Sequence, residues 1–158
     1  MKRGLADIAH MTLSEIQHQS HRSVYRVIYA DTDNMGVAYH GNYLRWFEIG
    51  RTELLRHWGL PYRRIEAQGV MLPVSEAYCR YLKPVRYDEQ VIIETTIDPT
   101  IKGALKCDYR ILRHEDQELV ATGYTKHAYV NGEGRVIRPP RFLVELLHQH
   151  LSETYRED

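Results

Sequence analysis

The sequence predicts one α+β domain in which an antiparallel sheet of about five strands packs around one long helix. Three observations carry this prediction. The 158 residues suit a single domain with its own core. A strand-like segment near the N-terminus is followed by one long apolar segment with helical spacing. Four more strand-like segments then follow one another with short links, which typically join antiparallel strands.

Residues 22–29 predict the first strand, because their side chains alternate between two faces. Turn-forming residues then fill positions 30–40. Residues 42–58 carry apolar side chains at helical spacing over so broad a surface that the predicted helix must be covered on most sides. Gly59 and Pro61 end this helix, because glycine favours the position after the last turn and proline cannot continue it.

The four later strands are predicted from runs of alternating or β-branched residues separated by turn formers. Gly123 lies inside the last run and marks a candidate β-bulge. A short amphipathic helix is predicted after two prolines. A broad apolar helix wrapped by an antiparallel sheet is the hot-dog architecture. The four strands and the final helix are predicted at residues 71–81, 90–97, 104–112, 119–130 and 141–150.

The predicted hot-dog domain covers residues 21–150. Residues 1–20 form a polar lead-in, in which Thr12 and Glu15 have the spacing of a capping box for a short helix. Residues 151–158 are expected to form a C-terminal tail.

Composition argues against several classes of protein. The net charge is zero, whereas nucleic-acid-binding proteins usually carry a basic excess. No segment approaches the roughly 20 apolar residues that span a bilayer, and the N-terminus lacks the apolar run of a signal peptide. Cys79 and Cys107 lie in strand-like runs without metal-ligand spacing, so both thiols are expected to be reduced. We therefore expect a cytoplasmic protein with no nucleic-acid partner and no membrane span.

The loop before the long helix holds the candidate chemistry. Asp31 and Asp33 lie in this loop, and the first N–H groups of the helix, near His40, Gly41 and Asn42, lack partners within the helix. Those groups carry partial positive charge and can receive an oxyanion. A carboxylate beside such donors suits the hydrolysis of a thioester. Aspartate before a helix is also a common turn former or cap, so spacing alone leaves both roles open.

This region resembles the signature of the 4-hydroxybenzoyl-CoA thioesterase family, in particular the branch that includes the thioesterase associated with the Tol-Pal system. The looser resemblance covers most of residues 22–140. The residues that carry it are Tyr29, Asp31, Thr32, Asp33, Gly36, Val37, Tyr39, His40, Asn42, Tyr43, Phe47, Glu48, Arg51 and Leu55, followed by Pro73, Tyr81, Pro84, Asp88 and Lys102.

The resemblance implies an acyl-CoA thioesterase that needs no cofactor. It implies that Asp33 is the catalytic carboxylate, either as the nucleophile or as a general base that activates water. It implies that the backbone N–H of His40 polarises the thioester carbonyl, and that the side chains of Tyr29 and His40 lie in the site. Met35 stands where the family usually has a small residue, and is expected to border the acyl pocket.

Two further groups are candidates. Glu48 shares a helix face with Arg51 and either pairs with it or serves as a second candidate for the catalytic carboxylate. The resemblance implies that Lys102 binds the phosphates of CoA. Arg80, Lys83 and Arg86 are weaker candidates for the same basic rim. The dispersed histidines form no metal-binding pattern, so no metal is expected.

The resemblance also implies a homo-oligomer, a dimer or a tetramer, with active sites at subunit interfaces. An exposed strand edge is commonly covered by a partner, which agrees with this expectation. Two alternatives to the enzyme remain. A non-catalytic hot-dog acyl-CoA-binding protein usually carries a DNA-binding module, for which the 20-residue lead-in is short. The second alternative is a hot-dog dehydratase that acts on acyl-carrier-protein substrates. Such enzymes have a different motif, with a histidine in a Pro/Gly-rich loop and an acid on the helix, and the Asp31-Thr32-Asp33 run argues against it.

Overall fold

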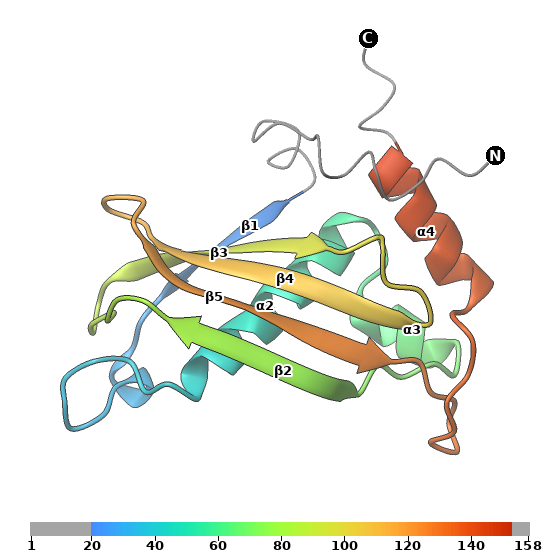
Figure 1. Cartoon of the computed structure of the whole chain (residues 1–158), viewed down its shortest axis with the longest axis horizontal. Coiled ribbons are helices and arrows are strands. Elements are labelled where there is room, and N and C mark those ends of the chain that lie inside the picture. The colour runs from blue at the N-terminus through green and yellow to red at the C-terminus, as the bar shows by residue number, and fades with distance from the viewer. Residues whose placement is uncertain (1–19, 153–158) are drawn as a thin grey trace, which may run out of the picture.

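The computed structural model describes residues 20–152 and contains a five-stranded antiparallel sheet with one long helix across one of its faces (Figure 1). The fold class is therefore the predicted one. The helix expected near Thr12 lies outside the described residues. In chain order the elements are β1 (His21–Arg26), a 3-10 helix (Tyr29–Asp31), α2 (Asn42–His57), α3 (Tyr62–Ala67), β2 (Val74–Tyr81), β3 (Gln90–Ile97), β4 (Ala104–Arg113), β5 (Leu119–Ala128) and α4 (Arg141–Ser152).

The strands lie in the order β1-β3-β4-β5-β2, and every neighbouring pair is antiparallel. Strands β3, β4 and β5 are joined as consecutive hairpins. Strand β2 pairs with β5 instead of with β3, which follows it in the sequence. The sheet therefore has two free edges, β1 and β2.

Helix α2 packs its apolar side on the sheet. Tyr43, Trp46, Phe47 and Leu54 are buried there. The opposite side is open in the single chain, where Leu44 keeps 42% of its surface exposed. The expectation of a helix covered on most sides is therefore wrong for one chain, because the sheet covers only one side of it.

Gly123 is not a β-bulge, because it pairs in register with Cys79 on β2 and with Tyr109 on β4. Its lack of a side chain has another cause. A Cβ atom at this position would lie 2.7 Å from the ring of Phe47, which stacks on Tyr109 with ring centroids 4.2 Å apart. Gly123 therefore makes room for the helix on the sheet.

Several boundaries differ from the expectation by a few residues, and one helix was not expected. The first strand ends at Arg26, because the chain turns into the 3-10 helix that contains Tyr29. Helix α3 was not expected. It begins directly after Pro61, and proline at a helix start removes no needed hydrogen bond.

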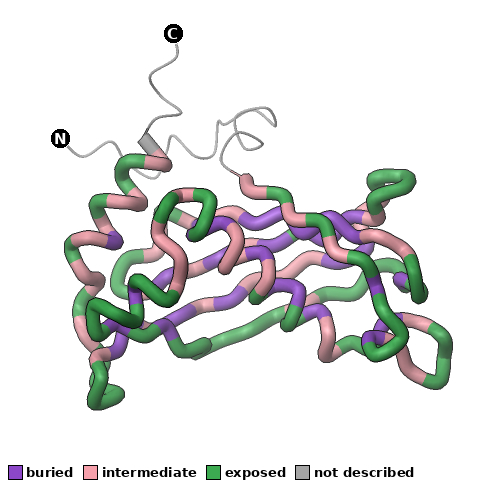
Figure 2. The backbone as a smooth tube through the Cα atoms, turned by 180° about the vertical axis from the view of Figure 1, so that it is seen from behind, coloured by how far each residue is buried: buried purple, intermediate pink, exposed green. Residues whose placement is uncertain are grey.

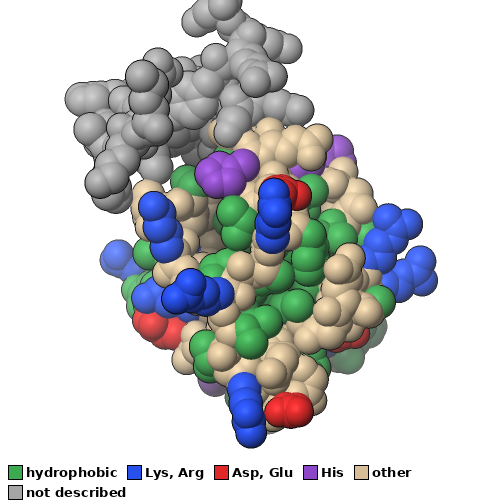
Figure 3. All heavy atoms as spheres, turned by 90° about the vertical axis from the view of Figure 1, so that its right-hand side faces the viewer, with side chains coloured by type: hydrophobic (Ala, Val, Ile, Leu, Met, Phe, Trp, Pro, Cys, Tyr) green, Lys and Arg blue, Asp and Glu red, His purple; other side chains and the backbone are tan. Residues whose placement is uncertain are grey.

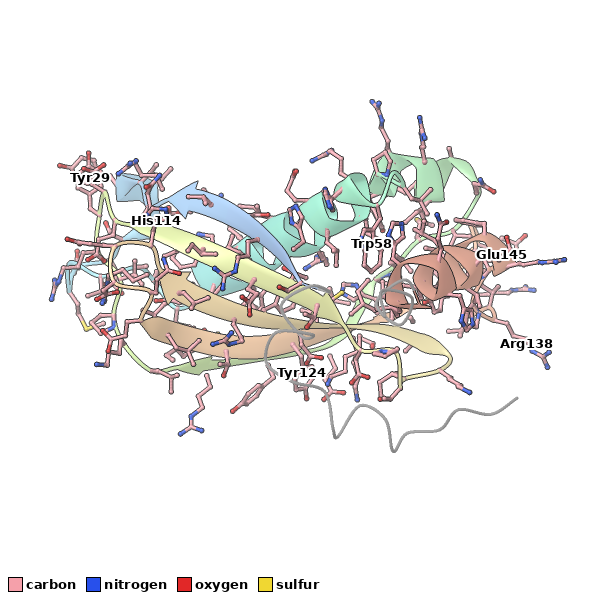
Figure 4. All side chains as sticks on the ribbon, turned by 90° about the horizontal axis from the view of Figure 1, so that it is seen from above. Tyr29, Trp58, His114, Tyr124, Arg138 and Glu145 are labelled. Atoms are coloured by element: carbon pink, nitrogen blue, oxygen red, sulfur yellow. The ribbon has the colours of Figure 1, made fainter. Side chains whose placement is uncertain are left out.

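Helix α4 closes one end of the molecule. Trp58 follows α2 and stacks on His150 of α4 with ring centroids 4.7 Å apart, and its side chain lies between the two helices in Figure 4. At this end, hydrophobic side chains gather among scattered lysines and arginines (Figure 3). None of the helices within residues 20–152 is long and apolar enough to cross a membrane. Cys79 and Cys107 are free thiols, and burial raises the pKa of Cys107 to about 12.

Candidate active site

Asp31 anchors the loop before α2 and is fully buried. Its Oδ2 accepts hydrogen bonds from the hydroxyl of Tyr25, at 2.8 Å, and from the backbone N–H of Ile28, at 2.9 Å. Its Oδ1 lies 3.6 Å from the guanidinium of Arg45. Oδ1 accepts no hydrogen bond in the described residues, but it is buried beside Arg45, so the carboxylate has a structural role rather than an oxygen exposed to substrate.

Asp33 lies two residues further on and is half-buried. Its Oδ1 accepts a hydrogen bond of 2.9 Å from the N–H of Met35, and its backbone carbonyl accepts one from Gly36. Gly36 has φ 75°, a value that favours glycine, so the turn is tight. Among residues 20–152, no hydrogen bond or ion pair uses Oδ2 of Asp33. One carboxylate oxygen is therefore available to a ligand.

The loop brings Asp33 and the start of α2 onto one short segment. Thr32 and Ala38 form an antiparallel bridge, and the N–H of Asp33 donates to the carbonyl of Val37, at 3.0 Å. The bridge folds the chain back on itself. Residues 33–37 form the turn that it closes, and His40 follows the bridge toward α2.

The N-terminus of α2 offers two amide groups. The N–H groups of His40 and Gly41 take part in no hydrogen bond with any residue in the described range. Asn42 differs, since its N–H donates to the carbonyl of Tyr39 and its side-chain amide donates to the carbonyl of Asp31, at 2.7 Å. The backbone N–H of Asn42 is therefore not free to receive an oxyanion, whereas its side-chain amide keeps a second N–H beyond the one that holds the loop.

Tyr81, at the end of β2, fixes this helix start. Its hydroxyl donates a hydrogen bond of 2.7 Å to the carbonyl of His40. Burial raises the pKa of Tyr81, so the hydroxyl stays protonated as a donor at neutral pH. The imidazole of His40 is exposed and lies against Tyr39, with ring centroids 4.3 Å apart. It is therefore open to a ligand near the two amide groups.

Tyr29 and Met35 lie on the surface of the same end of the molecule. Tyr29 is 73% exposed and stacks on Tyr87 with ring centroids 3.7 Å apart, and Figure 4 shows it at the far end from Trp58. Met35 is 76% exposed at the tip of the acidic loop. In one chain neither side chain encloses a pocket.

Glu48 lines a pocket of about 180 Å³ beside α2, whose other walls come from α3, from the chain before β2 and from β4 and β5. It forms no ion pair with Arg51, so the expected pair is absent from the described part of the chain. Burial raises the pKa of Tyr109 and lowers that of His127, and the charge of Arg51 partly offsets the first shift and adds to the second, so Arg51 acts on the protein interior. The pocket residues are Glu48, Arg51, Thr52, Leu55, Tyr62, Leu72, Leu105 and His127.

A buried chain of hydrogen bonds forms the floor of this pocket. Nδ1 of His127 lies 3.0 Å from the carbonyl of Leu72, which can only accept, so Nδ1 carries the proton. Nε2 then accepts from the hydroxyl of Thr125, at 2.8 Å, and Thr125 accepts from the hydroxyl of Tyr109, at 2.7 Å. Burial lowers the pKa of His127, which agrees with a neutral ring.

The basic residues expected to bind the CoA phosphates do not lie together in a single chain. Lys102 lies in the hairpin between β3 and β4, at the end of the sheet opposite the acidic loop (Figure 1). Lys83 forms an ion pair with Glu118. Arg86 does lie beside the loop, because its guanidinium donates to the carbonyl of Gly36, at 3.5 Å.

Sequence reasoning assigned no role to Tyr25 or Tyr81, which hold the two ends of the loop. Tyr81 belonged to the looser resemblance, which is the only sequence signal for it. The role of Tyr25 depends on a contact that the spacing of residues does not reveal.

The sequence and the fold both match known proteins. A family model described as the thioesterase-like superfamily matches residues 27–149. An acyl-CoA thioester hydrolase of Escherichia coli is 35% identical over 91 residues, which cover 58% of this chain and 68% of that protein.

Two solved structures are similar over most of the chain. A hypothetical protein of Thermus thermophilus has 35% identity and a TM-score of 0.75, and the match covers 81% of this chain and 97% of that one. A DHNA-CoA thioesterase of Staphylococcus aureus has 31% identity and a TM-score of 0.77, over 86% of this chain and 91% of that one. Because the family model covers more than half of the chain, the protein belongs to the thioesterase-like superfamily, as a thioester hydrolase with the hot-dog fold.

Proposed function

We propose that this protein hydrolyses an acyl-CoA thioester to a free acid and CoA, and that Asp33 is the carboxylate that drives the reaction. The observation that carries the proposal is the loop of residues 31–41. It holds an aspartate with an unengaged oxygen and, at its end, the unbonded N–H groups of His40 and Gly41.

In this reaction the thioester carbonyl oxygen accepts hydrogen bonds from the N–H groups of His40 and Gly41 at the N-terminus of α2, and negative charge develops on that oxygen. Asp33 takes a proton from water that attacks the carbonyl carbon, or attacks that carbon itself to give an anhydride that water then splits. The carbon–sulfur bond breaks, and sulfur leaves as the thiolate of CoA. General-base assistance contributes about 10²–10⁴-fold to such a step.

The relatives support the substrate class. The Escherichia coli protein is named an acyl-CoA thioester hydrolase, and the Staphylococcus aureus structure a DHNA-CoA thioesterase. We also propose that the protein belongs to the 4-hydroxybenzoyl-CoA thioesterase family and to its Tol-Pal-associated branch. Free thiols at Cys79 and Cys107 suit a reducing compartment, so we propose the cytoplasm as its location.

We propose that two copies pair through β2 and that each site lies at the resulting interface. Every residue of β2 except Cys79 is exposed, and Figure 2 shows an almost continuous exposed run along this edge. The other edge, β1, alternates between half-buried and exposed residues, so it offers a less continuous exposed edge than β2. A tetramer of two such dimers is the further expectation from the family.

Pairing through β2 would cover the open flank of α2, because Tyr81 of β2 contacts the helix start. Tyr29 and Met35 lack an enclosing wall in one chain, and a second copy is the proposed source of it. Arg86, beside the acidic loop, is the base that we propose for the CoA phosphates. Lys102 can share this role only from another copy, because it lies at the opposite end of its own sheet.

The alternative is a hot-dog protein that binds acyl-CoA without cleaving it. Thiol release and acyl-CoA binding should both be measured with purified protein over a panel of short, long and aromatic acyl-CoA compounds. We expect thiol release from at least one compound, with the free acid formed in equal amount. Binding without thiol release across the panel would support the binding protein and contradict the enzyme.

A further inference from the structure

The pocket on the flank of α2 combines apolar walls with two opposite charges that do not pair with each other. Leu55, Leu72 and Leu105 form apolar walls. Its volume of about 180 Å³ is comparable with the ~150 Å³ cavity that holds a benzene molecule. It therefore suits the end of an acyl group rather than the nucleotide of CoA.

Glu48 and Arg51 are one turn apart on the helix surface that lines the pocket. Within residues 20–152, Glu48 is exposed and forms no ion pair or hydrogen bond, and Arg51 forms no ion pair, although its guanidinium lies close enough to Tyr109 to interact with that hydroxyl. Side chains with this spacing have Cβ atoms about 5–6 Å apart. A donor and an acceptor that face one pocket without meeting leave room for a group that accepts from one and donates to the other.

Of the other polar neighbours of the pocket, which are Thr52, Tyr62 and His127, the histidine is not available to a ligand. Both ring nitrogens of His127 are engaged, one with Leu72 and one with Thr125. The guanidinium of Arg51 and the carboxylate of Glu48 are therefore the charged groups that a ligand can meet.

The pocket and the free N–H groups at the N-terminus of α2 lie on one flank of this helix. Gly41, Leu44, Glu48 and Leu55 repeat at helical spacing, and Leu44 is exposed between these N–H groups and the pocket. Glu48 lies two turns after Gly41, about 10 Å along the helix axis. An acyl group whose carbonyl lies at these N–H groups reaches the pocket if it has medium length.

We propose that the substrate is an acyl-CoA of medium length with a hydroxyl group at its far end, and that Arg51 and Glu48 recognise this hydroxyl. The guanidinium donates to the hydroxyl oxygen, and the hydroxyl donates to the carboxylate. A terminal methyl group offers neither charge a hydrogen-bond partner, and a terminal carboxylate is repelled by Glu48. This inference rests on the proposed acyl-CoA hydrolysis with Asp33 as the reacting carboxylate.

The test compares kcat/KM for acyl-CoA compounds of equal length that end in methyl, hydroxyl or carboxylate. We expect the hydroxyl compound to exceed the methyl compound about tenfold or more, and to exceed the carboxylate compound as well. A preference for the carboxylate would assign Arg51 to anion binding and overturn the hydroxyl assignment. Equal values for all three would overturn recognition of the far end altogether.

Arg51→Met should reduce the ratio of hydroxyl to methyl kcat/KM toward one. Arg56→Met is the matched control, because Arg56 lies on the same helix, is exposed and pairs with Glu53, away from the pocket. The control should keep the wild-type ratio. An unchanged ratio in Arg51→Met would contradict the proposal.

A second variant covers the case in which Arg51→Met does not fold. Thr52→Phe places a ring into the pocket from the helix surface, and Thr52 is only half-buried. We expect the medium-length compounds to lose kcat/KM at least tenfold more than acetyl-CoA does. Equal losses would show that the acyl group does not enter this pocket. If no acyl-CoA at all releases thiol in the wild type, the proposed hydrolysis fails first, which distinguishes the two failures.

Discussion

At the scale of single residues, two aspartates only two positions apart have opposite environments. Asp31 is fully buried beside Tyr25 of β1, Ile28 and Arg45 of α2. Asp33 is half-buried, and one of its carboxylate oxygens has no partner in the described residues. The motif identified both residues as candidates. Which one is buried depends on Tyr25 and Arg45, and only the folded chain brings these beside Asp31.

Asp31→Ala should lower the free energy of unfolding by about 3 kcal/mol, because it leaves the part-buried hydroxyl of Tyr25 and N–H of Ile28 without an acceptor. Asp33→Ala is the matched control, since it removes one hydrogen bond at a half-buried turn. Its expected loss is below about 1 kcal/mol. Urea unfolding of both variants measures the difference, and equal losses would contradict the structural role of Asp31.

His127 should make stability depend on pH. Burial lowers its pKa in the folded chain, and the carbonyl of Leu72 only partly offsets this. The unfolded chain therefore binds more protons below pH ~6.5, so the free energy of unfolding should fall as pH falls through that region.

The measurement is the slope of unfolding free energy against pH between about 7.5 and 5.5. His127→Gln should reduce this slope. His21→Gln is the comparison, because burial also lowers the pKa of His21 but His21 is more exposed. A slope that changes in His21→Gln but not in His127→Gln would contradict a buried, neutral His127.

At the scale of elements, periodicity predicted α2 and the five strands closely, because long segments give a clear repeat. The six-residue α3 is too short to show one. The first strand was predicted too long because the alternation continues to Tyr29, whereas the chain turns after Arg26 so that Asp31 reaches the N–H of Ile28. The start of α2 was predicted well, but not which of its amides are free.

Gly41→Pro tests the free amide directly. Gly41 has φ −65°, which proline adopts, so the substitution removes the N–H, but it also restricts the backbone of His40 and its Cβ must displace the ring of Tyr39, 2.8 Å away. Gly41→Ala is the control, because it keeps the N–H while its Cβ meets the same ring of Tyr39. We expect turnover of the proline variant to lie about 10²-fold or more below that of the alanine variant. Equal turnover would leave the N–H of His40 as the only amide donor.

At the scale of the whole molecule, the order of strands was beyond sequence reasoning. Strand β2 pairs with β5, and nothing in the run of residues 71–81 indicates that partner. The open flank of α2 and the exposed β2 edge share one side of the molecule, which is why the site is proposed to be completed by a second copy.

Val74→Lys should raise the dissociation constant of the dimer about tenfold or more, because it places charge on the β2 edge. Val24→Lys is the matched control on the β1 edge, where the valine is similarly exposed, at 55% against 49%. Sedimentation of both variants over a range of concentrations gives the constants. A larger effect from Val24→Lys would move the interface to β1.

The central claim is that the carboxylate of Asp33 carries the hydrolysis. Its most direct test is the kcat of Asp33→Asn on the best acyl-CoA, measured beside Glu48→Gln with folding checked by thermal unfolding. The account predicts a fall of about 10²-fold or more for Asp33→Asn and a much smaller change for Glu48→Gln. Turnover that survives Asp33→Asn but is lost in Glu48→Gln would contradict it.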